Sequence, residues 1–409
     1  MGRGGPPLVR WGSMTGRCHR TGTEKRITMR AMTQRRRGIA VLAGLTAVLL
    51  ASATGLPAAA AQPRAVDPLQ REVDAIHRMG ALGVLAEVSA PGGRTVARAG
   101  SADAGSGRPM PWDGRRIGSA TKTFTAAVVL QLVEKGRMSL DDTVEHWLPG
   151  VVRGHGNDGR LITVRQLLRH TSGLGDVAPG IAALNSAPGY RAERFRTYTP
   201  GELVRIAVSD SPKFPPGKGW SYSNTNYVLA AMIIEKVTGR SWAREVEARI
   251  ISPLGLSGTS VPGTFPFVRG PHAHGYAAFG TGEHTDVTTL DPSMAIGSGA
   301  IVSTAHDLTR FYAALLGGRL LEPAQLAEMK AAEDAPELGV GYGLGIAEIP
   351  LSCGGTYFGH RGELLGYTAW AGATPDGGRS AAVYINNDGG RDTEAAMLTL
   401  MDREMCGAG

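Results

Sequence analysis

The residues best suited to chemistry are a serine and a lysine three positions apart, Ser119 and Lys122, at the start of an expected helix. Residues three apart on a helix share a face, so the Lys122 amine is expected to stand over the Ser119 hydroxyl. A serine hydroxyl is a weak nucleophile that needs an adjacent base, and a lysine made neutral by burial or by a nearby cation can be that base. A helix-capping serine beside a surface lysine has the same spacing, so the pair alone leaves both interpretations open.

Two further polar motifs follow along the chain. Tyr222 and Asn224 belong to a Tyr-Ser-Asn sequence in a loop just before an expected helix, and His360 opens the only His-x-Gly sequence, where an expected strand ends. A tyrosine can relay a proton to a leaving group, and an asparagine amide can bind a substrate carbonyl. The Tyr-Ile-Asn sequence at 384–386 repeats the pattern, but inside an expected strand its two polar side chains would share a face and serve packing.

Other histidines fit structural roles better. His170 suggests a Ser-His-Asp triad, yet it lies where a helix is expected to end before Gly173. His272 and His274 have the spacing of two metal ligands but lack a third ligand nearby, so neither a metal site nor a cofactor is expected.

The elements that must position these motifs come in a recognisable order. A helix at 67–79 and a strand hairpin at 84–88 and 95–99 come first, and the Ser119 helix ends at Gly136. Helical patterns fill residues 138–285, the clearest at 164–169, 227–237 and 241–251. Later elements are helices at 306–316 and 323–332, strands at 343–349, 356–359, 367–373 and 381–386, and a helix at 392–405.

This order predicts an α+β fold, in which one antiparallel sheet is built from both ends of the chain and flanked by helices. The sheet lobe is expected at about 67–137 and 286–409, and an inserted, mostly helical lobe at about 138–285. An inserted lobe creates a groove at the junction, where sites are common.

The charge of the chain is concentrated at its start. Residues 1–61 hold ten of the 43 basic and one of the 36 acidic residues, which leaves 33 basic and 35 acidic residues from Gln62 onward. The body of the protein therefore does not fit a nucleic-acid or acidic-membrane binder. Arginines at 35–37, an apolar run at 39–50 and four alanines at 58–61 are typical of a secretory signal peptide.

We therefore expect an N-terminal extension at 1–31 that is not part of the fold, a signal peptide at 32–61, and a secreted domain at 62–409 without a membrane anchor. Met29 and Met32 are both suitable as true starts of translation. Cys353 and Cys406 form an even pair in an oxidising compartment, and we expect a disulfide between them rather than two buried thiols.

Together, the Ser-x-x-Lys, Tyr-Ser-Asn and His-x-Gly motifs resemble those of the penicillin-recognising serine hydrolases, the β-lactamase and penicillin-binding-protein superfamily. The flanking sequences at 162–174 and 297–304 support the resemblance, which runs from about Asp67 to Cys406. The chain is most similar to the secreted, soluble D-alanyl-D-alanine carboxypeptidase/transpeptidases, which also carry such a cysteine pair.

The resemblance implies a role for each site residue. Ser119 would attack a carbonyl, Lys122 would take or share its proton, and Tyr222 would relay a proton to the leaving group, either as a phenolate or through Lys122. Asn224 would bind the substrate, and His360 would supply polarity beside Tyr222. The oxyanion would be bound by the backbone N–H groups of Ser119 and of Glu363, which follows Gly362.

The expected substrate depends on Arg361 and Glu363, which stand where the relatives have small hydroxyl residues. Arg361 could grip a terminal carboxylate in place of an arginine that the relatives carry elsewhere. Alternatively, Glu363 or Glu348 pairs with Arg361, and the site prefers a neutral or cationic substrate.

The sequence therefore predicts a monomeric secreted carboxypeptidase that acts on D-Ala-D-Ala ends of cell-wall peptides and binds β-lactams. The alternatives are an esterase or D-amino-acid amidase of the same fold, acting on small ester or amide substrates, and a non-catalytic binding protein.

Overall fold

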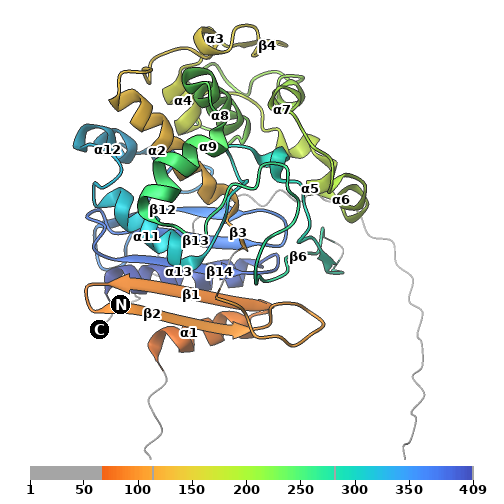
Figure 1. Ribbon diagram of the computed structural model, residues 1–409, viewed down its shortest axis with the longest axis vertical. Helices are drawn as coiled ribbons and strands as arrows, with labels where there is room; N and C mark the ends of the chain where they lie inside the picture. Colours follow the sequence, from red (N-terminus) through yellow and green to blue (C-terminus); the bar gives the residue numbers. More distant parts are fainter. Residues whose placement is uncertain (1–66, 113–114, 281, 408–409) are drawn as a thin grey trace, which may run out of the picture. The chain divides into compact units, whose positions relative to one another are not determined.

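An eight-stranded antiparallel sheet organises the computed structural model, which describes residues 67–112, 115–280 and 282–407 (Figure 1). The strands are β1 Gly83–Ala90, β2 Gly93–Gly100, β9 Glu333–Ala335, β10 Val340–Tyr342, β11 Ala347–Pro350, β12 Thr356–Glu363, β13 Thr368–Ala373 and β14 Ser380–Ile385. Their order in the sheet is β2-β1-β14-β13-β12-β11-β10-β9, so β1, near the start of the described chain, pairs with β14, near its end. The predicted extension and signal peptide lie outside the described residues.

Successive side chains along the strands belong alternately to two hydrophobic cores, one on each face of the sheet. In β14, Ala381, Val383 and Ile385 belong to one buried cluster, whereas Ala382 and Tyr384 belong to the other. Successive strand side chains point to opposite faces, so a strand covered on both sides is apolar along its whole length.

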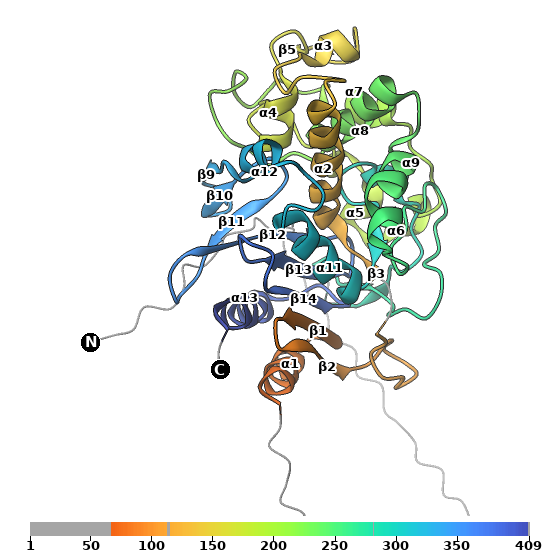
Figure 2. The same ribbon diagram turned by 60° about the vertical axis from the view of Figure 1, so that its left-hand side comes forward.

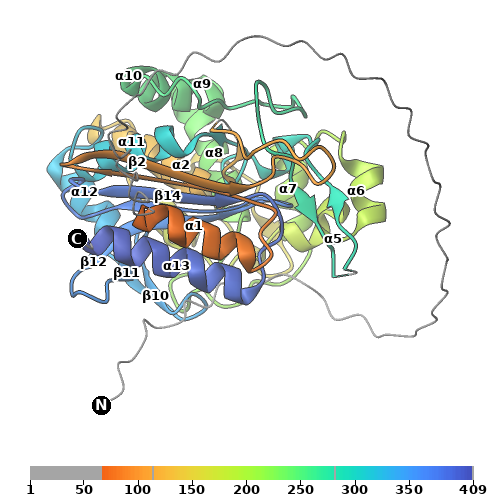
Figure 3. The same cartoon turned by 90° about the horizontal axis from the view of Figure 1, so that it is seen from below.

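Helices cover both faces of the sheet. Helix α1 Pro68–Arg78 and helix α13 Arg391–Cys406 lie side by side on one face (Figure 3). Helix α11 Ala305–Leu316 packs against β13 and β14 from the other face (Figure 2). This architecture confirms the predicted α+β fold with a flanked antiparallel sheet.

The remaining helices belong mainly to the segment between β2 and α11. Helix α2 Thr121–Glu134 is buried on nearly every side and packs against α8 Thr225–Thr238, as expected for a helix that is apolar all round. The others are α3 Val144–Trp147, α4 Val164–Arg169, α5 Ala182–Asn185, α6 Ala187–Glu193, α7 Pro200–Ala207, α9 Trp242–Val246, α10 Ser252–Leu254 and, after α11, α12 Pro323–Lys330.

Short turns and strand pairs complete the described chain. The 3-10 turns are η1 Gly118–Ala120, η2 Ala178–Gly180 and η4 Pro292–Ala295, and η3 Glu247–Ile251 is a π-helical turn within the helix predicted at 241–251. The strand pairs are β3 Arg115–Arg116 with β8 Val302–Ser303, β4 Arg153–Gly154 with β5 Asn157–Asp158, and β6 Tyr276–Ala277 with β7 Thr285–Asp286.

Two strand predictions were wrong in their bounds. Of the strand expected at 343–349, only 347–349 belong to a strand, β11. Residues 343–346 form the turn between β10 and β11, because Gly345 has φ +75° and the Gly343 N–H donates to the Ile346 carbonyl at 2.8 Å. The strand expected to end at Gly359 continues as β12 to Glu363. The third motif therefore lies inside a strand and follows the alternation of its side chains.

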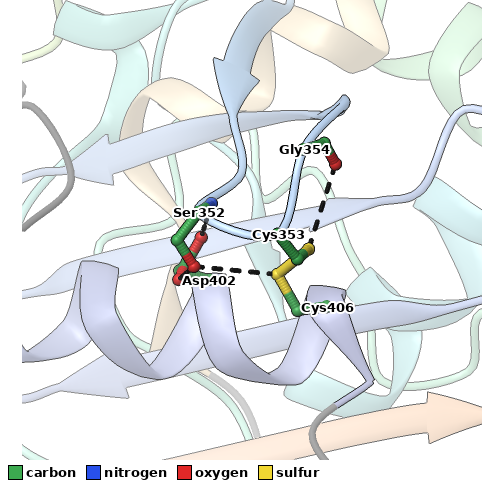
Figure 4. Close-up of a disulfide and its surroundings, with 5 residues drawn as sticks. All are labelled: Ser352, Cys353, Gly354, Asp402 and Cys406. Carbon is green, nitrogen blue, oxygen red and sulfur yellow. Dashed lines mark hydrogen bonds between the residues drawn. A yellow bond between two sulfur atoms is a disulfide. The ribbon is translucent and has the colours of Figure 1, made fainter. Parts of the chain in front are cut away.

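The predicted disulfide joins Cys353, in the loop between β11 and β12, to Cys406 at the end of α13 (Figure 4). Beside it, the Ser352 backbone N–H and hydroxyl both donate to the Asp402 carboxylate, at 2.8 and 2.5 Å. The bond therefore ties α13 to the sheet. In the part of the chain that the structure describes, no helix combines the length and apolar character needed to cross a bilayer.

Candidate active site

Ser119 and Lys122 lie where the chain enters helix α2. The turn η1 carries Ser119, and α2 begins two residues later. Lys122 is fully buried, and its Nζ donates to Ser119 Oγ at 3.0 Å. The structure thus brings together the pair that the sequence singled out.

The Lys122 amine is held by two further acceptors. It donates to Asn224 Oδ1 at 2.7 Å and to the Ser298 carbonyl at 3.0 Å. Burial lowers the pKa of Lys122 to about 7, and the Asp176 carboxylate acts in the opposite direction. Near neutral pH, much of the amine is therefore unprotonated and able to accept the Ser119 proton.

Tyr222 lies in the loop before α8, over the same amine. The Lys122 Nζ is 4.8 Å from the centroid of the Tyr222 ring. Burial raises the pKa of Tyr222 well above its usual value, although a hydrogen bond with Ser119 opposes this shift. The phenol therefore keeps its proton at neutral pH, which suits a proton donor and disfavours the phenolate alternative.

Asn224 joins the second motif to Lys122 through an orientation fixed by Asp176. The backbone N–H and the side-chain Nδ2 of Asn224 both donate to Asp176 Oδ1, at 2.9 and 3.1 Å. With the amide nitrogen directed at a carboxylate, the amide oxygen faces the lysine.

His360 is buried in β12, on the face of the sheet toward the helical segment. Its Nδ1 donates to the Arg361 carbonyl at 2.5 Å, and its Nε2 accepts from the Tyr342 hydroxyl at 2.9 Å. Burial, together with the Lys122 charge, lowers the pKa of His360 to about 3, so the ring is neutral. The rings of His360 and Tyr222 are 6.5 Å apart, and His360 supports the site as a neutral group.

Two glycines allow β12 to approach the turn of Ser119. A Cβ at Gly362 would lie 2.0 Å from the Ile117 carbonyl oxygen, and one at Gly118, which has φ +48°, would lie 2.5 Å from the Glu363 backbone nitrogen. No larger residue fits either position. The Glu363 main chain consequently lies against the Ser119 turn. An oxyanion site built from the backbone N–H groups of Ser119 and Glu363 requires this arrangement.

The sequence left two alternatives for Arg361, binding of a substrate carboxylate or an ion pair with Glu363 or Glu348, and the structure shows the ion pair with Glu363. His360 pairs across the sheet with Ala371, whose side chain belongs to the core below the helical segment, whereas Arg361 pairs with Trp370, in the core beside α13. Strand alternation therefore turns Arg361 away from the site. There it forms ion pairs with Glu363, at 2.5 Å, and with Glu394 of α13.

Sequence reasoning did not identify three contributors to the site: Asp176, Ser298 and Tyr342. Asp176 closely follows the sequence at 162–174, and Ser298 lies in the sequence at 297–304, both of which were noted only as flanks. Tyr342 carries no motif signal at all. Each acts through a partner that is distant in the chain, which no local pattern reports.

The remaining polar candidates have structural partners. His272 and His274 donate from Nδ1 to the Gly270 carbonyl and the Asp286 carboxylate, both at 2.8 Å. Across residues 67–112, 115–280 and 282–407, no three His, Cys, Asp or Glu side chains gather in a way that could hold a metal ion. In the repeated Tyr-x-Asn pattern, Tyr384 is in the core, and Asn386 Nδ2 donates to the Ser101, Ala102 and His274 carbonyls.

Comparisons with known proteins agree with this geometry. The family model described as Beta-lactamase matches residues 69–403. Penicillin-binding protein 4 of Amycolatopsis lactamdurans is 30% identical over 304 residues, which cover 71% of this chain and 75% of that protein. This chain spans about half the length of several other curated relatives, among them penicillin-binding proteins of Bacillus subtilis.

Solved structures extend the similarity. The structure of a D-stereospecific amidohydrolase from Streptomyces sp. has a TM-score of 0.77 and 44% identity and covers 83% of this chain and 98% of its own. A D-amino acid amidase from Ochrobactrum anthropi SV3, complexed with L-phenylalanine, has a TM-score of 0.71 and 29% identity, with coverage of 82% and 96%. The chain therefore belongs to the β-lactamase and penicillin-binding-protein family of serine hydrolases.

Proposed function

We propose that this protein hydrolyses amide or ester bonds of D-aminoacyl compounds that lack a free terminal carboxylate, through an acyl-enzyme on Ser119. The observation that carries the proposal is the hydrogen bond of 3.0 Å from the buried Lys122 amine to the Ser119 hydroxyl, beside a protonated Tyr222.

Acylation then proceeds in a defined sequence of proton transfers. Ser119 Oγ attacks the substrate carbonyl carbon while its proton passes to neutral Lys122. The backbone N–H groups of Ser119 and Glu363 bind the oxyanion, an interaction in which each donor contributes about 2.7–4 kcal/mol. Tyr222 gives its proton to the leaving nitrogen or oxygen and regains one from Lys122, and water then hydrolyses the ester on Ser119.

The charges around the second motif support a neutral or cationic substrate. Asp176 and Glu337 place carboxylates at this loop, with the Tyr222 backbone N–H donating to Glu337 at 3.1 Å. The guanidinium that could have bound a carboxylate, that of Arg361, is paired with two glutamates on the other face of β12. A protonated α-amino group would be favoured here, and a substrate carboxylate would be repelled.

The similarity to the Streptomyces D-stereospecific amidohydrolase supports the D configuration and the amide bond. The carboxypeptidase hypothesis remains the alternative, and its support is the similarity to penicillin-binding protein 4. We also propose that the protein is exported by the signal peptide at 32–61, acts as a monomer without a cofactor, and is acylated by β-lactams.

Labelling with a penicillin and two hydrolysis assays distinguish an amidase, a carboxypeptidase and a non-catalytic protein. Purified protein is incubated with a labelled penicillin and mapped by peptide mass spectrometry, then assayed with a D-amino acid amide and with a peptide that ends in D-Ala-D-Ala. We expect label on Ser119 and release of ammonia from the amide. Faster release of D-alanine from the peptide would establish the carboxypeptidase instead. Absence of both label and turnover would indicate a non-catalytic protein.

A further inference from the structure

His170 is a buried histidine that holds both neighbours of Tyr222. Helix α4 ends at this residue, which has φ +64°. The His170 carbonyl accepts from the Ser221 N–H at 3.0 Å, and His170 Nδ1 accepts from the Ser223 N–H at 3.2 Å. The two amides on either side of Tyr222 are thus bound by one residue.

The imidazole ring also supports the phenol directly. The rings of His170 and Tyr222 lie 4.4 Å apart at an angle of 33°, and Tyr227 and Tyr342 surround the same imidazole, at 5.3 and 5.1 Å. A ring wedged among aromatic neighbours has little freedom to move. One side of Tyr222 therefore rests on a fixed surface.

The protonation of His170 is set by its partners. A backbone N–H can only donate, so Nδ1 carries the lone pair and the ring proton is on Nε2. The Asn226 amide nitrogen lies 3.1 Å from the same Nδ1, while its oxygen accepts from the Ser172 hydroxyl at 2.6 Å. Burial and the Lys122 charge lower the pKa of His170 well below its usual value, so the lone pair stays available.

We propose that His170 is a positioning residue that holds the Tyr222 phenol beside Ser119 by accepting the Ser223 amide at Nδ1. This inference rests on the role given to Tyr222 in the proposed function. His170 itself touches none of the reacting atoms of Ser119 or Lys122 and gains or loses no proton.

If His170 positions Tyr222, the rate lost when His170 is replaced should depend on the leaving group of the substrate. An amine must be protonated as it leaves, whereas p-nitrophenolate leaves readily as an anion. Loss of a positioned general acid typically costs about 10²–10⁴-fold in rate, and this cost should fall on amides. Release of Tyr222 should therefore lower kcat for a D-amino acid amide by about 10²-fold or more and leave the p-nitrophenyl ester within about tenfold, with KM little changed.

Two variants isolate the Nδ1 acceptor. In His170→Asn the amide oxygen can occupy the place of Nδ1, and asparagine tolerates the left-handed backbone. In His170→Gln the amide lies one bond farther out, nearer the place of Nε2. We expect His170→Asn to keep the wild-type ratio of amide to ester rates within about tenfold, and His170→Gln to reproduce the altered ratio of Tyr222→Phe.

Thermal unfolding shows whether each variant is folded, and His170→Gly replaces His170→Gln if the latter is not. Equal losses of amide and ester hydrolysis would overturn the inference, because a merely structural residue changes both rates together. Crystal structures of the variants give a readout without turnover: Tyr222 should leave Ser119 in His170→Gln and stay in His170→Asn. A phenol that stays in both would overturn the inference even if the wild type hydrolyses neither substrate, a result that would refute the proposed function separately.

Discussion

The two faces of strand β12 carry polar groups of opposite kinds. Toward the helical segment, His360 is neutral and bonded to Tyr342, and Gly362 lets the strand touch the Ser119 turn. Toward α13, Arg361 is charged and neutralised by Glu363 and Glu394. Four consecutive residues thus serve two separate environments, and adjacency within a strand motif does not imply a shared site.

The largest effect should come from a substitution in the active site that one face of β12 borders. Ser119→Ala removes the nucleophile, and we expect turnover to fall by on the order of 10⁶-fold, as it does when the serine of other serine hydrolases is lost. Steady-state rates and labelling with a β-lactam measure this. Ser252→Ala, an exposed serine of α10, is the control. Label retained in Ser119→Ala would place the chemistry elsewhere.

On the α13 face, the disulfide should matter for stability alone. The Cys353→Ser/Cys406→Ser variant opens a loop with a sequence separation of 53 residues. We expect the free energy of unfolding to fall by about 2–4 kcal/mol while kcat is unchanged. Urea denaturation of the variant and of the wild type, oxidised and reduced, checks this. Lost turnover in a folded variant would show that the α13 face of the sheet also affects catalysis.

Arg361→Met sharpens the same comparison. It leaves two carboxylates without their partner, and we expect a loss of about 1–3 kcal/mol in unfolding free energy, less than for a fully buried pair because Glu363 is half exposed. KM for a neutral amide should not change. Arg361→Met/Glu394→Gln should recover part of the stability. A rise in KM for the neutral amide would mean that Arg361 contacts the substrate after all.

The smallest effects concern the pH dependence of kcat/KM. Because burial lowers the pKa of Lys122 to about 7, the neutral base is the minor form below that pH and the major form above it. We expect kcat/KM to fall about tenfold per pH unit below pH 7 and to level off above it.

Asp176→Asn tests whether the titration of Lys122 causes the fall of kcat/KM below pH 7, the acidic limb of the pH profile. The variant removes the charge that raises the pKa of Lys122, so the limb should move to lower pH. His360, with a pKa of about 3, is neutral on both sides of the limb and should not contribute to it. Rates measured across pH 5 to 9, about two units either side of the expected midpoint, give the answer, and a limb that does not move would exclude the assignment to Lys122.

Much of the fold was predictable because its signals are local. Alternating and helical periods located the longest helices and six of the eight strands of the main sheet, and the cysteine pair was found bonded. Strands β9 and β10 were not predicted, and the errors at β11 and β12 arose where a glycine turn or continued strand pairing decided the bounds. The face on which Arg361 lies depended on β12 continuing past Gly359, which the motif alone could not reveal.

The sequence by itself determined the placement of Lys122 beside Ser119, because a helical turn brings residues three apart onto one face. Only the tertiary structure decided that Asn224, 102 residues beyond Lys122, accepts from its amine, that Asp176 orients this amide, and that Arg361 is turned away. It also decided the protonation states of Lys122, Tyr222 and His360. Burial and long-range hydrogen bonds set these properties, and both depend on segments that meet only when the whole chain is folded.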